Sequence, residues 1–159
     1  MAAQPGLLPI INAEGCEPQG PQLVGIARLA AEGEHLGDGH NVEYTTIPVR
    51  SLLNQCTAPR MPFTWTINPY RGCEFACKYC YARYTHEFME LRDSLDFERK
   101  IFVKQQTAWL LRRDLKRVKP HESIAVGTAT DPYQPAERKV RHAAPSWRNW
   151  RSMPDFPSV

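Results

Sequence analysis

Three cysteines lie close together in the segment CEFACKYC, at Cys73, Cys77 and Cys80. Three residues separate the first two and two residues separate the second pair, so their thiolates can converge only if the backbone wraps around a common centre. Soft thiolate ligands select iron–sulfur clusters, zinc or copper(I). Three thiolates on a four-iron cluster leave one iron without a protein ligand, and Gly72 lets the backbone come close to the metal. The spacing therefore predicts a metal site with an open coordination position.

A structural zinc site is the alternative for the same cysteines. Zinc prefers four tetrahedral nitrogen or sulfur ligands, and His86, which follows Cys80 on the chain, would be the fourth. Structural zinc sites are usually closed by ligands in two separate pairs, which this spacing does not provide, so the cluster is favoured. The isolated cysteines Cys16 and Cys56 are expected to be small buried hydrophobic residues.

The segments around the cysteines predict alternating strands and helices. Aromatic and β-branched residues predict a strand over 63–67, and the recurrence of aromatic residues predicts a helix over 79–91 whose N-terminus points at the cysteines. A second strand is expected over 100–103, an amphipathic helix over 105–118 and a third strand over 123–127. This order, with crossovers long enough for parallel pairing, predicts an α/β protein.

The sequence around the cysteines, NPYRGCEFACKYCYAR over 68–83, resembles the cluster loop of radical SAM enzymes, whose signature is C-x3-C-x-aromatic-C. Together with GTATDPYQP over 127–135, it is similar to the spore photoproduct lyase-like, or DNA repair photolyase-type, subgroup. The resemblance covers about residues 63–139. It implies the N-terminal part of a partial (β/α)6 TIM-like barrel, with about three β/α units present, in a chain truncated or frame-shifted after about residue 139.

The same resemblance implies an iron–sulfur protein with a 4Fe–4S cluster on Cys73, Cys77 and Cys80, and with S-adenosyl-L-methionine bound to the free iron. One electron from the cluster would cleave the sulfonium, and the 5′-deoxyadenosyl radical would abstract hydrogen from a substrate, with DNA as one candidate. Flavodoxin or ferredoxin would be the reductant. Residues implied to bind the cofactor are Tyr79 near the adenine, Lys104 at the methionine carboxylate, and Thr128, Thr130 and Asp131 after the third strand.

The resemblance assigns no catalytic side chain, and two features limit the lyase-like enzyme that it implies. No cysteine follows Cys80, whereas spore photoproduct lyase has a downstream hydrogen-donating cysteine. Because later strands of the barrel are missing, an inactive part of such an enzyme is a further alternative, beside the non-catalytic zinc-binding module.

The composition bounds these expectations. The 159 residues are enough for one ordinary domain, and no apolar run approaches the roughly 18 residues that a membrane helix needs. The first fifteen residues lack the basic cluster and apolar core of a secretory signal. An odd number of cysteines, five, argues against a secreted disulfide framework. We therefore expect a protein of the reducing cytoplasm with no membrane partner.

Composition predicts a loop-rich N-terminal extension over 1–60 and an irregular tail over 140–159, and the resemblance implies an incomplete radical SAM core over 61–139 between them. Within the extension, residues 23–31 predict one short helix and residues 34–41 a polar turn. Residues 99–119 carry eight bases and one acid. A basic helix face is usually solvated, and contact with nucleic-acid phosphates is the weaker alternative for its side chains Arg112, Arg113, Lys116, Arg117 and Lys119.

Overall fold

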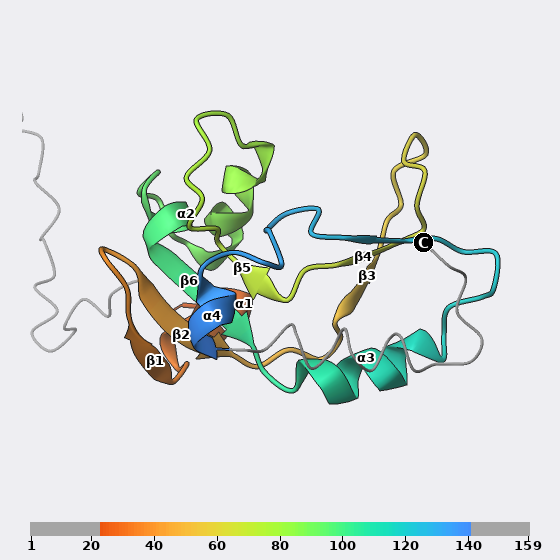
Figure 1. Cartoon of the computed structure of the whole chain (residues 1–159), viewed down its shortest axis with the longest axis horizontal. Helices are drawn as coiled ribbons and strands as arrows, with labels where there is room; N and C mark the ends of the chain where they lie inside the picture. Colours follow the sequence, from red (N-terminus) through yellow and green to blue (C-terminus); the bar gives the residue numbers. More distant parts are fainter. Residues whose placement is uncertain (1–22, 141–159) are drawn as a thin grey trace, which may run out of the picture.

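The computed structural model describes residues 23–140 (Figure 1). Its helices are short: α1 (Gly25–Ala31), a 3-10 helix η1 (Tyr81–Met89), α2 (Asp96–Arg99), α3 (Thr107–Leu115) and α4 (Ala136–Val140). Its strands are β1 (His35–Asp38), β2 (Glu43–Ile47), β3 (Leu53–Gln55), β4 (Trp65–Ile67), β5 (Tyr70–Arg71), β6 (Lys100–Lys104) and β7 (Ile124–Val126). None of the helices in this part of the chain is long and apolar enough to span a membrane.

The strands form two small mixed sheets. The first has the order β1-β2-β6-β5, in which β2 and β6 are parallel and the two outer pairs are antiparallel. The second has the order β3-β4-β7, with β3 antiparallel and β7 parallel to β4. In Figure 1, α1, α2 and α4 lie around the first sheet, and α3 runs beside β3 and β4. The cysteines follow β5, at one edge of the first sheet.

The expected (β/α)6 TIM-like barrel is wrong. All three predicted strands form, and β4 does pair in parallel with β7, but β6 lies in the other sheet, between β2 and β5. The reason is that residues 43–47 and 53–55, which were expected to be loop-rich, form β2 and β3. These strands occupy the edges of β6 and β4 at which a single parallel sheet would have continued. The described residues therefore form two separate sheets and no barrel.

The other expected elements differ in detail. The helix expected over 23–31 is confirmed as α1, whereas the polar turn expected over 34–41 is wrong, because residues 35–38 pair with β2 as strand β1. The helix expected over 79–91 is a 3-10 helix, which ends at Glu90 in a left-handed conformation. Cys16 and the tail beyond residue 140 lie outside the described residues.

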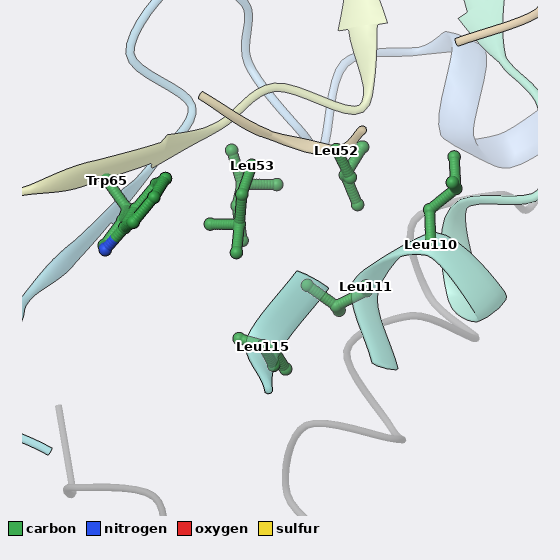
Figure 2. Close-up of a cluster of buried hydrophobic side chains, with 7 residues drawn as sticks. Leu52, Leu53, Trp65, Leu110, Leu111 and Leu115 are labelled. Carbon is green, nitrogen blue, oxygen red and sulfur yellow. The ribbon is translucent and has the colours of Figure 1, made fainter. Parts of the chain in front are cut away.

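The second sheet and α3 share one hydrophobic core. Figure 2 shows leucines of α3 facing the leucines at β3, and Trp65 of β4 lies at one end of the cluster. Leu111 is only 1% exposed, as the helical spacing of apolar residues in this segment requires. The cluster consists of Leu52, Leu53, Trp65, Ile67, Leu110, Leu111 and Leu115.

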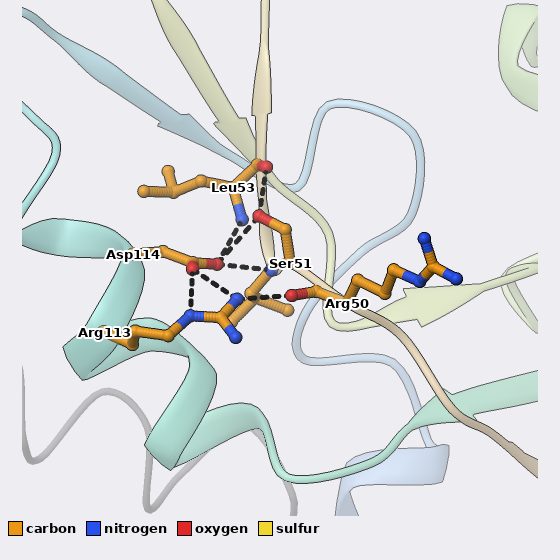
Figure 3. Close-up of polar contacts among 6 residues, drawn as sticks. Arg50, Ser51, Leu53, Arg113 and Asp114 are labelled. Atoms are coloured by element: carbon orange, nitrogen blue, oxygen red, sulfur yellow. Dashed lines mark hydrogen bonds and ion pairs between the residues drawn. The ribbon is translucent and has the colours of Figure 1, made fainter.

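A buried carboxylate fixes α3 to the segment that enters β3 (Figure 3). Asp114 is fully buried and accepts hydrogen bonds from the Ser51 hydroxyl at 2.8 Å and the Leu52 amide at 2.7 Å. The Arg113 guanidinium donates to the other carboxylate oxygen at 2.7 Å. Burial by itself would raise the pKa of Asp114, but these hydrogen bonds outweigh it and lower the pKa. Asp114 is therefore ionised and fully satisfied.

Candidate functional site

The cysteines lie on the loop between β5 and η1, which contains no helix or strand from residue 72 to residue 80. Cys77 is exposed, Cys73 and Cys80 are partly exposed, and none of the three forms a disulfide. The thiols are therefore chemically available. We call residues 72–80 the cysteine loop.

Gly72 lets this loop leave β5 while packed tightly on the chain before β6. Its φ is +82°, in the region that side chains disfavour, and a Cβ here would lie 2.6 Å from the carbonyl oxygen of Lys100. The next residue continues the contact, because the Cys73 amide donates to the carbonyl of Phe97 at 2.9 Å. Gly72 was expected to let the backbone come close to a metal. In the structure, the group that it approaches closely is neighbouring backbone.

Gln134 clasps the loop on both sides of Cys73. Its side chain is completely buried, and its amide Nε2 donates to the Gly72 carbonyl at 3.3 Å. Its Oε1 accepts from the Glu74 amide at 3.0 Å. One side chain therefore satisfies the two peptide groups that flank the first cysteine. This role of Gln134 was not predicted from the sequence, because a glutamine in a polar segment is usually exposed.

The segment 127–135 also reaches the sulfur of Cys73. Burial raises the pKa of the Cys73 thiol, while backbone N–H groups of Asp131 and Phe75 hydrogen-bond the sulfur and partly offset that rise. The negative charges of Asp131 and Cys77 act in the same direction as burial. Amide donors to sulfur are among the groups that tune metal-bound thiolates.

Asn68 forms hydrogen bonds with the same segment, residues 127–135. Its Oδ1 accepts from the Ala129 amide at 2.8 Å and its Nδ2 donates to the Thr128 hydroxyl at 3.0 Å. The buried hydroxyl of Thr130 donates to the Tyr70 carbonyl at 3.4 Å. Thr128, Thr130 and Asp131 are thus brought beside the cysteine loop. Asn68 was missed as a site residue because asparagine is common in loops for purely local reasons.

The other two residues implied to bind the cofactor lie in opposite environments. Tyr79 is 90% exposed on the cysteine loop. Lys104 is 5% exposed at the end of β6, and its amide donates to the Pro69 carbonyl at 3.2 Å. Burial, helped by the charge of Arg71, lowers the pKa of Lys104 to about 7. No carboxylate within residues 23–140 forms an ion pair with Lys104.

His86, the fourth ligand of the alternative zinc site, lies in the core. It is 2% exposed, and its ring packs edge-on against Phe97 with centroids 5.0 Å apart. Its Nε2 lies 3.3 Å from the Lys100 carbonyl, and burial lowers its pKa, which favours the neutral ring. These contacts account for His86 as a core residue.

A metal or cluster would need the cysteine loop to close further than it does. Over residues 23–140, no group of three or more His, Cys, Asp or Glu side chains is arranged to hold a metal ion. The donors themselves fit an iron–sulfur cluster, because they are three free thiols on one loop with amide N–H groups on the first sulfur. The part of the loop beyond Phe75 is exposed up to Tyr79, so its closure would displace no core residue.

Comparison with known proteins finds relatives without an assigned activity. The uncharacterized protein Mb2609c of Mycobacterium bovis and the uncharacterized proteins MT2655 and Rv2578c of Mycobacterium tuberculosis are each 38% identical to this chain over 120 residues. The match covers 74% of this chain and 34% of each relative, so the chain spans about a third of the length of these curated relatives. No family model and no solved structure matches the chain.

Proposed function

We propose that the cysteine loop binds a 4Fe–4S cluster through Cys73, Cys77 and Cys80, and that the protein belongs to the radical SAM enzymes. The observation that carries this proposal is the set of three free thiols on a loop whose first cysteine is fixed on both sides by Gln134. The contacts of Gln134 would hold the first thiolate in place for a ligand. When bound, the cluster would supply the single electron that cleaves S-adenosylmethionine.

Residues in and around the cysteine loop would perform three tasks. Gln134 and the Phe97 carbonyl orient the peptide groups at Cys73, which fixes the first thiolate before the others close. The amides of Asp131 and Phe75 stabilise negative charge on its sulfur. Cys77 lies on the exposed part of the loop and Cys80 is partly exposed at its end, and both would move to complete the site. Binding would therefore order the loop from Cys73 outward.

Lys104 is proposed as the partner of the methionine carboxylate. Its ammonium is buried at the end of β6 near Arg71, and no carboxylate of residues 23–140 pairs with it. A buried ammonium without a counter-ion is unfavourable, and a bound carboxylate would supply that charge. Tyr79 would pack on the adenine, and Thr128, Thr130 and Asp131 are proposed at the edge of the same site.

The compartment, the partners and the substrate of the whole protein are also proposed. The four free cysteines found between residues 23 and 140 support a reducing compartment, and we propose the cytoplasm. A flavodoxin or ferredoxin would deliver the electron. DNA is proposed as a candidate substrate only from the resemblance. The arginines in and just after α3 give it little support, because Arg113 pairs with Asp114 and stacks on Trp109, and Arg117 lies over Trp65.

Anaerobic reconstitution with iron and sulfide tests the proposal. We expect about four irons and four sulfides per chain, together with the absorption of an iron–sulfur cluster. Changing any one of the loop cysteines to Ala is expected to abolish loading, whereas Cys56→Ala, a matched change outside the loop, leaves it intact. One zinc per chain without acid-labile sulfide would refute the proposal, as would full cluster loading in the triple variant of Cys73, Cys77 and Cys80.

A further inference from the structure

A cavity outside the cysteine loop has an unusual lining. It has a volume of about 570 Å³ and lies between α1 and the segment that follows β2. Three of its lining residues are arginines, Arg28, Arg50 and Arg71, and none is acidic. No cysteine lines it. The cavity therefore has a positive potential that is independent of the proposed metal site.

Two of the three guanidinium groups have no counter-ion among the described residues. Arg28 pairs with Glu32 at 3.3 Å on the exposed side of α1. Within residues 23–140, neither Arg50 nor Arg71 forms an ion pair with a carboxylate. The backbone carbonyl of Arg50 accepts a bond from Arg113, but Figure 3 shows its side chain directed away from that network. Its guanidinium is thus available to the cavity that it lines.

Arg71 adds a second observation that points to a missing acceptor. Its Nε atom is buried and has no hydrogen-bond partner within the part of the chain that the structure describes. Buried donors are nearly always paired, and an exception calls for an explanation such as a bound ion. The Arg71 side chain is also partly buried, and a guanidinium removed from water is costly unless a counter-charge is present. An oxyanion in the cavity that Arg71 lines would satisfy both requirements.

The rest of the lining is apolar. Ile26 and Leu29 come from α1, and Ile47, Pro48 and Val49 from the end of β2 and the residues after it. These side chains give a ligand no hydrogen-bonding group but offer a surface for a nonpolar part. The cavity is therefore suited to a molecule that is anionic at one end and apolar at the other.

We propose that this cavity binds a phosphate monoester with an apolar body, its phosphate between Arg50 and Arg71 and its body against Ile26 and Leu29. Two guanidinium groups without counter-ions match the charge of a phosphate dianion, and their planar forks donate paired bonds to its oxygens. A carboxylate carries half that charge and leaves one guanidinium uncompensated. The site does not depend on the proposed cluster, so either proposal can fail alone.

The test is calorimetric titration of the full chain, without iron or sulfide, at about pH 7.5 where phosphate monoesters are dianions. Phenyl phosphate is the probe, with benzoate and inorganic phosphate as comparisons. We expect one phenyl phosphate per chain, bound about tenfold or more tightly than benzoate, because each charge-assisted pair contributes strongly. Ile26→Ala is expected to weaken phenyl phosphate and leave inorganic phosphate unchanged.

Charge variants locate the site. Arg50→Gln and Arg71→Gln are each expected to weaken phenyl phosphate by about tenfold or more. Arg92→Gln, a change of an exposed arginine outside the cavity lining, leaves binding unchanged. If Arg71→Gln fails to fold, Arg50→Gln still decides, because its side chain is exposed. No saturable binding up to about 10 mM, equal affinity for benzoate, or equal weakening by Arg92→Gln would overturn the proposal.

Discussion

The regions around the two sheets of this protein differ in whether their buried polar groups have hydrogen-bond partners. Beside the sheet β3-β4-β7, the carboxylate of Asp114 is fully buried and receives bonds from Ser51, Leu52 and Arg113. Around the sheet β1-β2-β6-β5 and the cysteine loop, three buried polar atoms of the described residues have no partner: Arg71 Nε, Glu74 Oε1 and His86 Nδ1. The buried Lys104 belongs to this second region as well.

We interpret this contrast as the difference between a stabilising region and the region proposed above to bind ligands. Natural proteins pair nearly all buried polar groups, and exceptions concentrate where a ligand or a reaction needs them. The α3 region has nothing left for a ligand to satisfy. Among the described residues, the region of the first sheet has free thiols, a buried lysine without an ion pair and the unpartnered Nε of Arg71, which the ligands proposed above would stabilise.

The largest effect is expected in the stabilising region. Asp114→Ala leaves the Ser51 hydroxyl and the Leu52 amide without their acceptor, so we expect the free energy of unfolding to fall by about 3–5 kcal/mol. Urea denaturation followed by circular dichroism measures this loss. Asp114→Asn, which keeps an acceptor oxygen, should lose less. A loss below about 1 kcal/mol in Asp114→Ala would remove the contrast.

An effect of opposite sign is expected at Lys104. Its pKa of about 7 in the folded protein lies below the unfolded value, so the unfolded chain binds the proton more tightly. The folded state is therefore penalised below about pH 7, and stability rises as the pH increases toward the unfolded pKa of about 10.4. Lys104→Met should raise the free energy of unfolding by about 1–4 kcal/mol at pH 7.

The pH dependence distinguishes this explanation from simple repacking. The gain in Lys104→Met should shrink as denaturation is repeated at pH values rising from about 7 to about 10. Lys116→Met, at the exposed residue directly after α3, is the matched control and should change stability little at any pH. A gain in Lys104→Met that is constant with pH would mean that the ammonium charge is not its source.

A smaller loss is expected at Gln134. Gln134→Ala removes the partners of the Gly72 carbonyl and the Glu74 amide, which should lower the free energy of unfolding by about 1–3 kcal/mol. Alkylation resolved by mass spectrometry should show Cys73 reacting faster in this variant, while the already exposed Cys77 is unchanged. An unchanged Cys73 rate would show that the clasp does not hold the loop.

The smallest effect is expected at Tyr79. Its side chain is 90% exposed, so Tyr79→Ala should change the free energy of unfolding by less than about 0.5 kcal/mol. If it packs on the adenine as proposed, the same variant should bind S-adenosylmethionine more weakly in equilibrium dialysis of the reconstituted protein. A large loss of stability instead would assign Tyr79 to the fold.

Local patterns predicted much of the fold but not its pairing. The apolar spacing at Leu111 and Leu115 identified α3, and the runs 63–67, 100–103 and 123–127 contain strands β4, β6 and β7. The missed β2 carries Thr45 and Thr46, which appear polar in sequence yet are buried in the sheet. Which strand pairs with β6 depends on contacts between distant segments, and local periodicity does not encode them.

The candidate site shows the same division. The thiols were identified because their residue type and spacing have few other uses. Asn68 and Gln134 were not, since a neutral amide indicates no particular chemistry until its partners are known. Their partners lie about sixty positions away along the chain, and η1, α2, β6, α3 and β7 lie between them in the sequence.

The glutamine clasp has a consequence for the order of events during biosynthesis. Gln134 follows Gly72 by 62 residues. When the three cysteines of a nascent chain have just left the ribosome, Gln134 is therefore not yet available to hold the peptide groups around Cys73. Inorganic cofactor delivered at that moment would meet a loosely held segment. If the loop binds a cluster as proposed, loading onto a correctly shaped loop would have to wait until Gln134 has been synthesised.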